Sequence, residues 1–65
     1  MRVTLAVVGD EEHAFEVEAG TTYADLLADL GVSPHEVAVL VDGTPVPEDA
    51  PAEADATVVR MVAGG

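Results

Sequence analysis

The residues with the clearest chemical use are two glycines, Gly64 and Gly65, at the end of the sequence. They follow directly on a mostly apolar run, residues 58–62. Glycine loses more backbone freedom on ordering than any other residue, so a strand or helix gains nothing by ending in it. A narrow, pliable carboxylate has another use, because an enzyme can thread it into a groove and act on it. We therefore expect a domain of residues 1–62 and a flexible diglycine tail of residues 63–65.

The other side chains that could do chemistry have simpler structural explanations. His13 and His35 are not spaced like a pair of metal ligands, and the chain has no Cys. His35 and Glu36 could form an acid–base pair, but they lie in a helix-start signal, which favours a capping role. The acidic residues 10–12 and 48–55 do not match a calcium loop, so we assign them to the surface. Without a catalytic triad or a phosphate-binding loop, we expect no enzymatic activity and no bound metal or cofactor.

The charge of the chain limits the classes of partner it can bind and the salt concentration in which it is expected to fold. Thirteen acidic residues stand against two basic ones in a chain of 65, with no Lys and a net charge of −11. Nucleic-acid binding is excluded, because contacts to phosphate need a basic surface. Such self-repulsion weakens a compact state unless salt screens it, so we expect adaptation to high salt, as in halophiles. No apolar stretch is long enough to span a membrane and no signal peptide is visible, which predicts a cytoplasmic monomer.

The N-terminal third of the chain predicts a β-hairpin. Residues 2–8 and 13–18 alternate apolar and polar positions, and a short polar turn joins them. The residues expected to face the core are Val3, Leu5, Val7, Phe15 and Val17.

The period then changes to that of a helix. Thr22 is a good N-cap, Asp25 three residues later resembles a capping box, and Gly31 suits the position just after the helix end. At about eight residues this helix is too short to persist alone, so we expect it to lie across the apolar face of the hairpin. Its apolar stripe consists of Tyr23, Leu26, Leu27 and Leu30.

The second half of the chain predicts further strands. Residues 33–36 form a single helical turn that leads into an apolar strand, residues 37–41. Asp42-Gly43 is a strong hairpin turn, and the two prolines in residues 44–47 allow only a short edge strand. The final strand covers residues 56–62. The order β-β-α-β-β-β indicates one α+β domain, a mixed sheet of four to five strands with one helix packed across it.

These elements and motifs resemble the ubiquitin-like β-grasp family. The similarity is to the small archaeal modifier proteins, haloarchaeal type, and to the sulfur carriers of thiamine and molybdopterin synthesis. This resemblance implies that the first and last strands run parallel at the sheet centre and that the carboxyl terminus projects from a central strand. The segments that carry it are residues 22–27, 33–37, 40–43, 46–47 and 62–65.

The resemblance also implies a function for the tail. An E1-like activating enzyme would adenylate Gly65 with ATP and Mg²⁺, and Gly64 would let the tail lie flat. The acyl group would then pass to lysines of target proteins. The alternative is a sulfur carrier that receives a C-terminal thiocarboxylate from a sulfur donor, for tRNA thiolation or cofactor synthesis. A third possibility is a β-grasp interaction domain whose glycines are incidental. Because the chain lacks Lys, only its amino terminus could accept another copy, so single attachment is expected.

The final strand leaves two questions open. Arg60 could steer the tail into an acidic groove of the activating enzyme, or it could be a solvated residue near Arg2. Val59 and Met61 could form an exposed apolar surface for a partner, although core packing is the simpler expectation. The alternative inward-facing set is Val58 and Val62.

Overall fold

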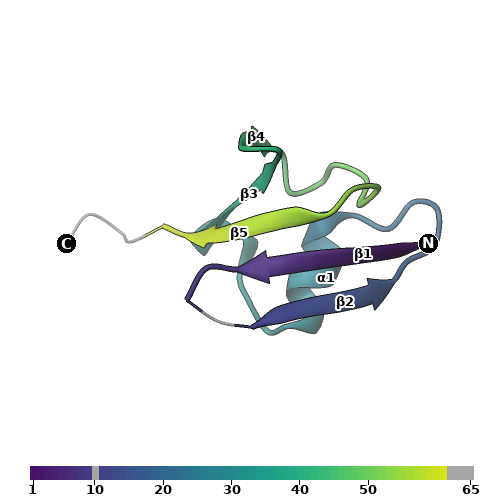
Figure 1. Cartoon of the computed structure of the whole chain (residues 1–65), viewed down its shortest axis with the longest axis horizontal. Coiled ribbons are helices and arrows are strands. Elements are labelled where there is room, and N and C mark those ends of the chain that lie inside the picture. The colour runs from purple at the N-terminus through teal and green to yellow at the C-terminus, as the bar shows by residue number, and fades with distance from the viewer. Residues whose placement is uncertain (10, 62–65) are drawn as a thin grey trace.

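The computed structural model describes residues 1–9 and 11–61 of the chain. It shows a five-stranded mixed sheet in the order β2-β1-β5-β3-β4, with one α-helix packed against one face (Figure 1). This is the α+β architecture expected from the sequence. The elements are β1 (Arg2–Val7), β2 (Glu12–Glu16), α1 (Tyr23–Asp29), the 3₁₀ turn η1 (Pro34–Glu36), β3 (Val37–Val41), β4 (Thr44–Val46) and β5 (Ala56–Arg60).

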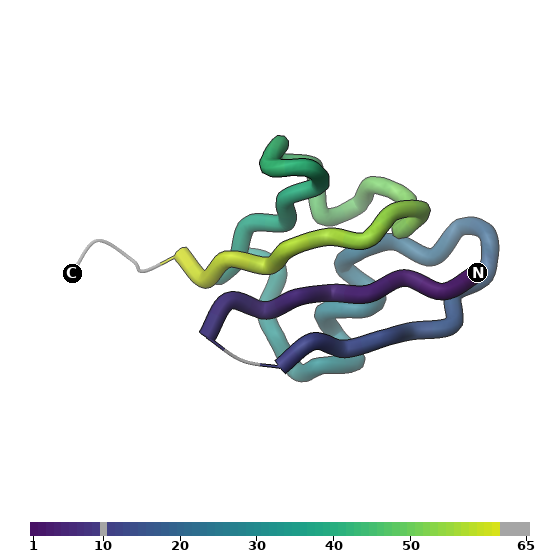
Figure 2. Tube along the Cα trace, viewed as in Figure 1, coloured from purple at the N-terminus to yellow at the C-terminus, as the bar shows by residue number. Residues whose placement is uncertain are grey.

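The first and last strands lie side by side in the middle of the sheet (Figure 2). β1 and β5 are parallel, with Leu5 opposite Ala56 and Val7 opposite Val58. Every other strand pair is antiparallel. The parallel central pair that the resemblance implied is therefore confirmed. Its consequence is that the start of β1 and the end of β5 lie at opposite ends of the sheet.

The second strand starts one residue earlier and ends two residues earlier than residues 13–18. β1 begins at Arg2, whose partner on β2 is Glu16, so only Met1 remains to extend the ladder. Val17 continues the pairing through its N–H, which donates to the Met1 carbonyl at 2.7 Å. Beyond that point the chain turns away toward the helix.

The helix starts and stops where its local signals predict. The Asp25 N–H donates to Thr22 Oγ1 at 3.2 Å, and the Thr22 N–H donates to Asp25 Oδ2 at 3.0 Å, which completes a capping box. α1 has seven residues and Leu30 is its C-cap; Gly31 comes next, and its φ of +73° lies in the left-handed region that favours glycine.

The loop before β5 is tied to the first turn of α1. The N–H groups of Tyr23 and Ala24 cannot bond within their own helix, and they donate to the carbonyls of Ala50 and Glu48 at 3.2 and 2.8 Å. The Tyr23 hydroxyl donates to the Ala54 carbonyl at 2.6 Å. The sequence predicted only an acidic loop here, and these bonds explain why it is ordered without forming a strand.

The expected hairpin and edge strand are also present. Asp42 and Gly43 both have positive φ, 52° and 78°, as a two-residue hairpin turn requires. β4 is three residues long and lies at the sheet edge, next to β3. Pro45 lies within it, and the missing N–H of proline is tolerated at an edge.

The core gathers residues from the sheet, the helix and the loop before β5. The expected inward residues Val7, Phe15 and Leu30 pack at its margin, partly buried. The buried residues are Val3, Leu5, Val17, Tyr23, Leu26, Leu27, Val37, Val39, Ala52, Ala56 and Val58.

Candidate functional site at the tail end of the sheet

β5 carries the chain from the sheet centre toward the diglycine residues. Its ladder with β3 runs to the pair Arg60–Val37, and the Met61 N–H donates to the Glu36 carbonyl at 2.8 Å. This hydrogen bond fixes Met61, the last described residue, to the body of the domain. The predicted tail, residues 63–65, lies outside the described residues. The structure thus fixes the position of the chain as far as Met61.

The structure settles which face of β5 points inward. Val58 is fully buried, with Ala56 on the same face, whereas Val59 is half-buried and Met61 is 52% exposed. Core packing of Val59 and Met61, the simpler expectation, is therefore wrong. The physical reason is the parallel register with β1, which sets Val58 beside the inward-facing Val7. Residue 62, the other member of the alternative inward set, lies outside the described residues.

A third apolar residue lies at the same end of the sheet. Val8 follows β1, and its N–H donates to the Val58 carbonyl at 2.9 Å, so it lies beside the end of β5. Its side chain is 61% exposed. We call Val8, Val59 and Met61 the tail-end apolar surface. Val8 lies within the first strand expected from the sequence, residues 2–8, but that expectation does not include its exposure. Its exposure could have been predicted from the sequence. Val3, Leu5 and Val7 occupy the inward-facing positions, so by alternation Val8 faces the opposite side of the sheet.

Arg60 adds a positive charge beside this surface. Its side chain is exposed, and no other residue within 1–9 and 11–61 forms an ion pair with it. The alternative in which Arg60 lies near Arg2 is wrong, because the parallel strands place Arg2 at the start of β1 and Arg60 at the end of β5. Arg2 instead lies 3.7 Å from the Glu16 carboxylate, Nε to Oε1.

The remaining candidates have local structural roles or no assigned one. The His35 N–H donates to Ser33 Oγ at 3.4 Å, which places His35 and Glu36 in the capped 3₁₀ turn, as expected. His13 lies on β2 opposite Leu5. In residues 1–9 and 11–61, no three His, Asp or Glu side chains gather closely enough to hold a metal ion. Within the same residues, no helix is long and apolar enough to cross a membrane.

The tail end therefore offers an apolar surface and a guanidinium group next to Met61, the last described residue. Apolar surface and a single positive charge suit recognition by another protein. The side chains of Val8, Val59, Met61 and Arg60 supply no nucleophile or general base, so any reaction at the tail would use groups brought by the partner.

Comparison with known proteins identifies the family. The family model of small archaeal modifier protein 2 matches residues 1–62. Small archaeal modifier protein 2 of Haloferax volcanii is 52% identical to this chain, and an uncharacterized protein of Archaeoglobus fulgidus is 39% identical, each match covering all of both chains. A solved structure of a ubiquitin from Caldiarchaeum subterraneum superposes with a TM-score of 0.73, at 14% identity, covering 100% of this chain and 98% of the other. That likeness confirms the ubiquitin-like β-grasp fold. The chain belongs to the small archaeal modifier protein 2 family, a family of ubiquitin-like modifiers.

Proposed function

We propose that this chain is attached to target proteins through Gly65, after activation by an E1-like enzyme. The carboxylate of Gly65 would attack the α-phosphorus of ATP, bound with Mg²⁺ on that enzyme, and pyrophosphate would leave. A lysine amine of the target would then attack the acyl carbon, releasing AMP and a proton and forming an isopeptide bond. A carboxylate needs this activation because its oxygen is otherwise a poor leaving group.

One observation carries the proposal. The central strand β5 is held in its ladder as far as Met61, and the tail-end apolar surface lies beside that point. From Met61 the four residues to Gly65 span at most about 14 Å when fully extended. An activating enzyme that docks on the apolar surface can therefore place its nucleotide within reach of the carboxylate. Membership of a modifier family supports the same conclusion.

The sulfur-carrier alternative uses the same carboxylate. There the acyl-adenylate is attacked by sulfur from a donor, and the product is a thiocarboxylate at Gly65. The intact mass of protein purified from its host distinguishes the two, because a thiocarboxylate replaces one oxygen by sulfur. Conjugation instead leaves residues 61–65 attached to a target lysine after trypsin, since Arg60 is the last tryptic site. If neither product is found, the chain acts as an interaction domain whose glycines are incidental.

The decisive experiment is ATP–pyrophosphate exchange with the E1-like enzyme of the host. We expect Gly65→Val, or deletion of Gly64 and Gly65, to abolish exchange, because a Cβ at these positions crowds the approach of the backbone to the nucleotide. Thermal unfolding should be unchanged, because the buried core is built from residues between Val3 and Val58. Full exchange with Gly65→Val would refute the proposal.

A further inference from the structure

One face of the sheet is left uncovered by the described part of the chain. Figure 1 views the sheet from this side, with α1 behind it. Side chains that point toward α1 from the two central strands, such as Leu5 and Val58, are fully buried. The residues between them alternate to the other side, where Thr4, Ala6 and Thr57 are only half-buried. We call this side of the sheet the open face.

The strand registers set four residues of the open face in one row. Ala6 on β1 lies opposite Glu12 on β2 and opposite Thr57 on β5, and Thr57 lies opposite Leu40 on β3. Alanine and threonine are small, so the middle of the row is lower than its sides. All four residues line a hollow of about 300 Å³. The open face therefore carries a hollow over its two central strands.

Three carboxylates from three separate elements line the same hollow. They belong to Glu12 at the start of β2, Asp42 in the turn between β3 and β4, and Asp55 just before β5. The Thr4 N–H donates to Asp55 Oδ1 at 2.9 Å, which fixes one of them at the rim. Within residues 1–9 and 11–61, none of the three forms an ion pair. The hollow therefore has a negative charge that the described residues do not neutralise.

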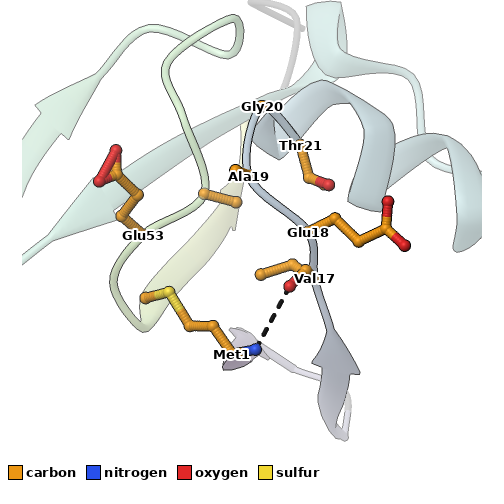
Figure 3. Close-up of a pocket in the computed structure, with 8 residues that line it drawn as sticks. Met1, Val17, Glu18, Ala19, Gly20, Thr21 and Glu53 are labelled. Atoms are coloured by element: carbon orange, nitrogen blue, oxygen red, sulfur yellow. Dashed lines mark hydrogen bonds between the residues drawn. The ribbon is translucent and has the colours of Figure 1, made fainter.

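A second hollow, of about 360 Å³, lacks this arrangement. It lies between the segment that leaves β2 and the loop before β5 (Figure 3). Val17, Ala19 and Ala52 give it apolar walls. The side chains of Glu18 and Glu53 extend away from its centre in opposite directions (Figure 3). Its chemistry therefore does not indicate an occupant, whereas the charge of the hollow on the open face does.

We propose that the hollow on the open face binds an arginine side chain of a partner protein. A guanidinium group has five donors in one plane, so it can bond to carboxylates on several sides at once. It is also less strongly hydrated than an ammonium group, and its flat face can lie on the small side chain of Ala6. The chain cannot supply this group itself, because Arg2 pairs with Glu16 and Arg60 lies at the tail end.

The surroundings of the hollow favour a polypeptide over a free cation. Leu40 lines one side of the hollow and is half-buried. Val59 follows Thr57 on the same face of β5, opposite Ala38 on β3, and both are half-buried. A free cation gains nothing from this apolar surface, whereas residues next to an arginine in a polypeptide can pack on it. The occupant is therefore an arginine that has apolar neighbours in its own chain.

A peptide titration followed by NMR tests the inference. The probe is a capped peptide with one arginine between two leucines, added to the ¹⁵N-labelled full chain. In about 1 M KCl, charges farther than about 3 Å from the peptide are screened. We expect saturable shifts that are largest at the amides of Thr4, Ala6 and Thr57. The same peptide with citrulline, a neutral analogue of arginine, should give none. Methylguanidinium alone should bind about fivefold more weakly, because it lacks the apolar surface that the leucines bury.

Two double variants with the same net charge separate the hollow from general acidity. Glu12→Gln with Asp42→Asn removes two of the three carboxylates, and asparagine tolerates the φ of +52° at position 42. Asp55 is kept because it is hydrogen-bonded to β1. The control is Asp29→Asn with Asp49→Asn, two exposed residues in α1 and in the loop tied to it. We expect the first variant to bind the arginine peptide about fivefold more weakly and the control to bind it unchanged.

A third variant tests the shape of the hollow. Ala6→Leu fills it without changing the charge, and should also weaken binding by about fivefold through loss of the space for the guanidinium. Thermal unfolding by circular dichroism shows whether each variant is folded. Equal losses in the two double variants, or shifts spread over all acidic residues, would mean that only net charge matters and would overturn the inference. Equal binding of the citrulline peptide, equal binding of methylguanidinium, or no saturable binding would also overturn it. None of these measurements involves activation of Gly65, so the inference stands or falls independently of the proposed function.

Discussion

Both ends of the sheet place a methionine next to an arginine, and the two ends use these residues differently. At the amino end, the Met1 amine bonds to the Val17 carbonyl, and Arg2 lies in an ion pair with Glu16. At the tail end, Arg60 has no ion-pair partner in the described part of the chain, and Met61 is held only through its backbone. At the amino end the methionine amine and the arginine side chain both have partners on or beside β2, whereas at the tail end the side chains of Arg60 and Met61 are exposed to solvent.

The difference follows from the topology. Antiparallel β2 lies against the start of β1 and provides Glu16 and Val17 as partners for the amino end. Near the end of β5, both neighbouring strands stop: β1 ends at Val7, opposite Val58, and β3 begins at Val37, opposite Arg60. A central strand whose neighbours stop at its end leaves its last side chains exposed. The end of β5 therefore leaves Met61, together with Val8, exposed at the edge of the ladder.

The largest expected effect comes from a pair of substitutions in neighbouring residues of β5. Val58→Asp should abolish cooperative unfolding, because a buried unpaired carboxylate costs several kcal/mol and a core of this size supplies only about 3–5 kcal/mol. Val59→Asp should keep the fold, because Val59 lies half-exposed on the opposite face. Circular dichroism during thermal unfolding measures both.

The same pair tests the role of the tail-end apolar surface. We expect Val59→Asp to lower ATP–pyrophosphate exchange by about tenfold, equivalent to about 1.4 kcal/mol of lost binding. Thr57 lies on the same strand and face, farther from the tail, so Thr57→Asp is a matched control that should keep exchange. Normal exchange with folded Val59→Asp would remove this surface from the proposal.

Salt should act in opposite directions on the two kinds of charge contact. It weakens the exposed ion pairs at the amino end, and it screens the repulsion among thirteen acidic residues. Because exposed pairs contribute little, we expect the second effect to win. The melting temperature should rise by roughly 5–10 °C from low to multimolar KCl, which corresponds to about 1–2 kcal/mol. Chloride is the right anion, since sulfate stabilises most proteins by exclusion from their surface. Equal melting temperatures at both salt concentrations would end the hypothesis of salt adaptation.

Much of the fold could be predicted because its signals are local. The capping box of Thr22 and Asp25 and the Asp42-Gly43 turn each depend on residues close in sequence, and the structure confirms them. The inward face of β1 follows from plain alternation. These features need no knowledge of distant partners, so a single sequence was enough.

What could not be predicted depends on pairing between distant segments. Val58, Val59 and Met61 are all apolar, so alternation cannot choose the inward face of β5; the register with β1 does. The bonds from the first turn of α1 to the loop before β5 use backbone carbonyls, which carry no sequence signal. The sequence therefore predicted which residues could form the candidate site. Only the structure showed where they lie and which of them are exposed.

The smallest expected effect concerns Arg2 and Arg60, one at each end of the sheet. Arg60→Gln and Arg2→Gln each make the net charge one unit more negative, but at opposite ends of the sheet. If Arg60 steers the tail toward an acidic groove, Arg60→Gln should lower kcat/KM for activation by about two- to fivefold at low salt. Arg2→Gln should leave it unchanged, since Arg2 already lies beside Glu16.

Salt distinguishes steering from contact. Long-range attraction is lost near 1 M salt, where the Debye length is about 3 Å, so a steering role predicts that the Arg60→Gln defect disappears there. A defect that persists at high salt would indicate a direct bond between the guanidinium and the enzyme. Equal defects in both variants would mean that net charge alone matters. No defect in either variant, at the lowest salt at which the enzyme works, would make Arg60 a solvated residue and leave recognition at the tail end to Val8, Val59 and Met61.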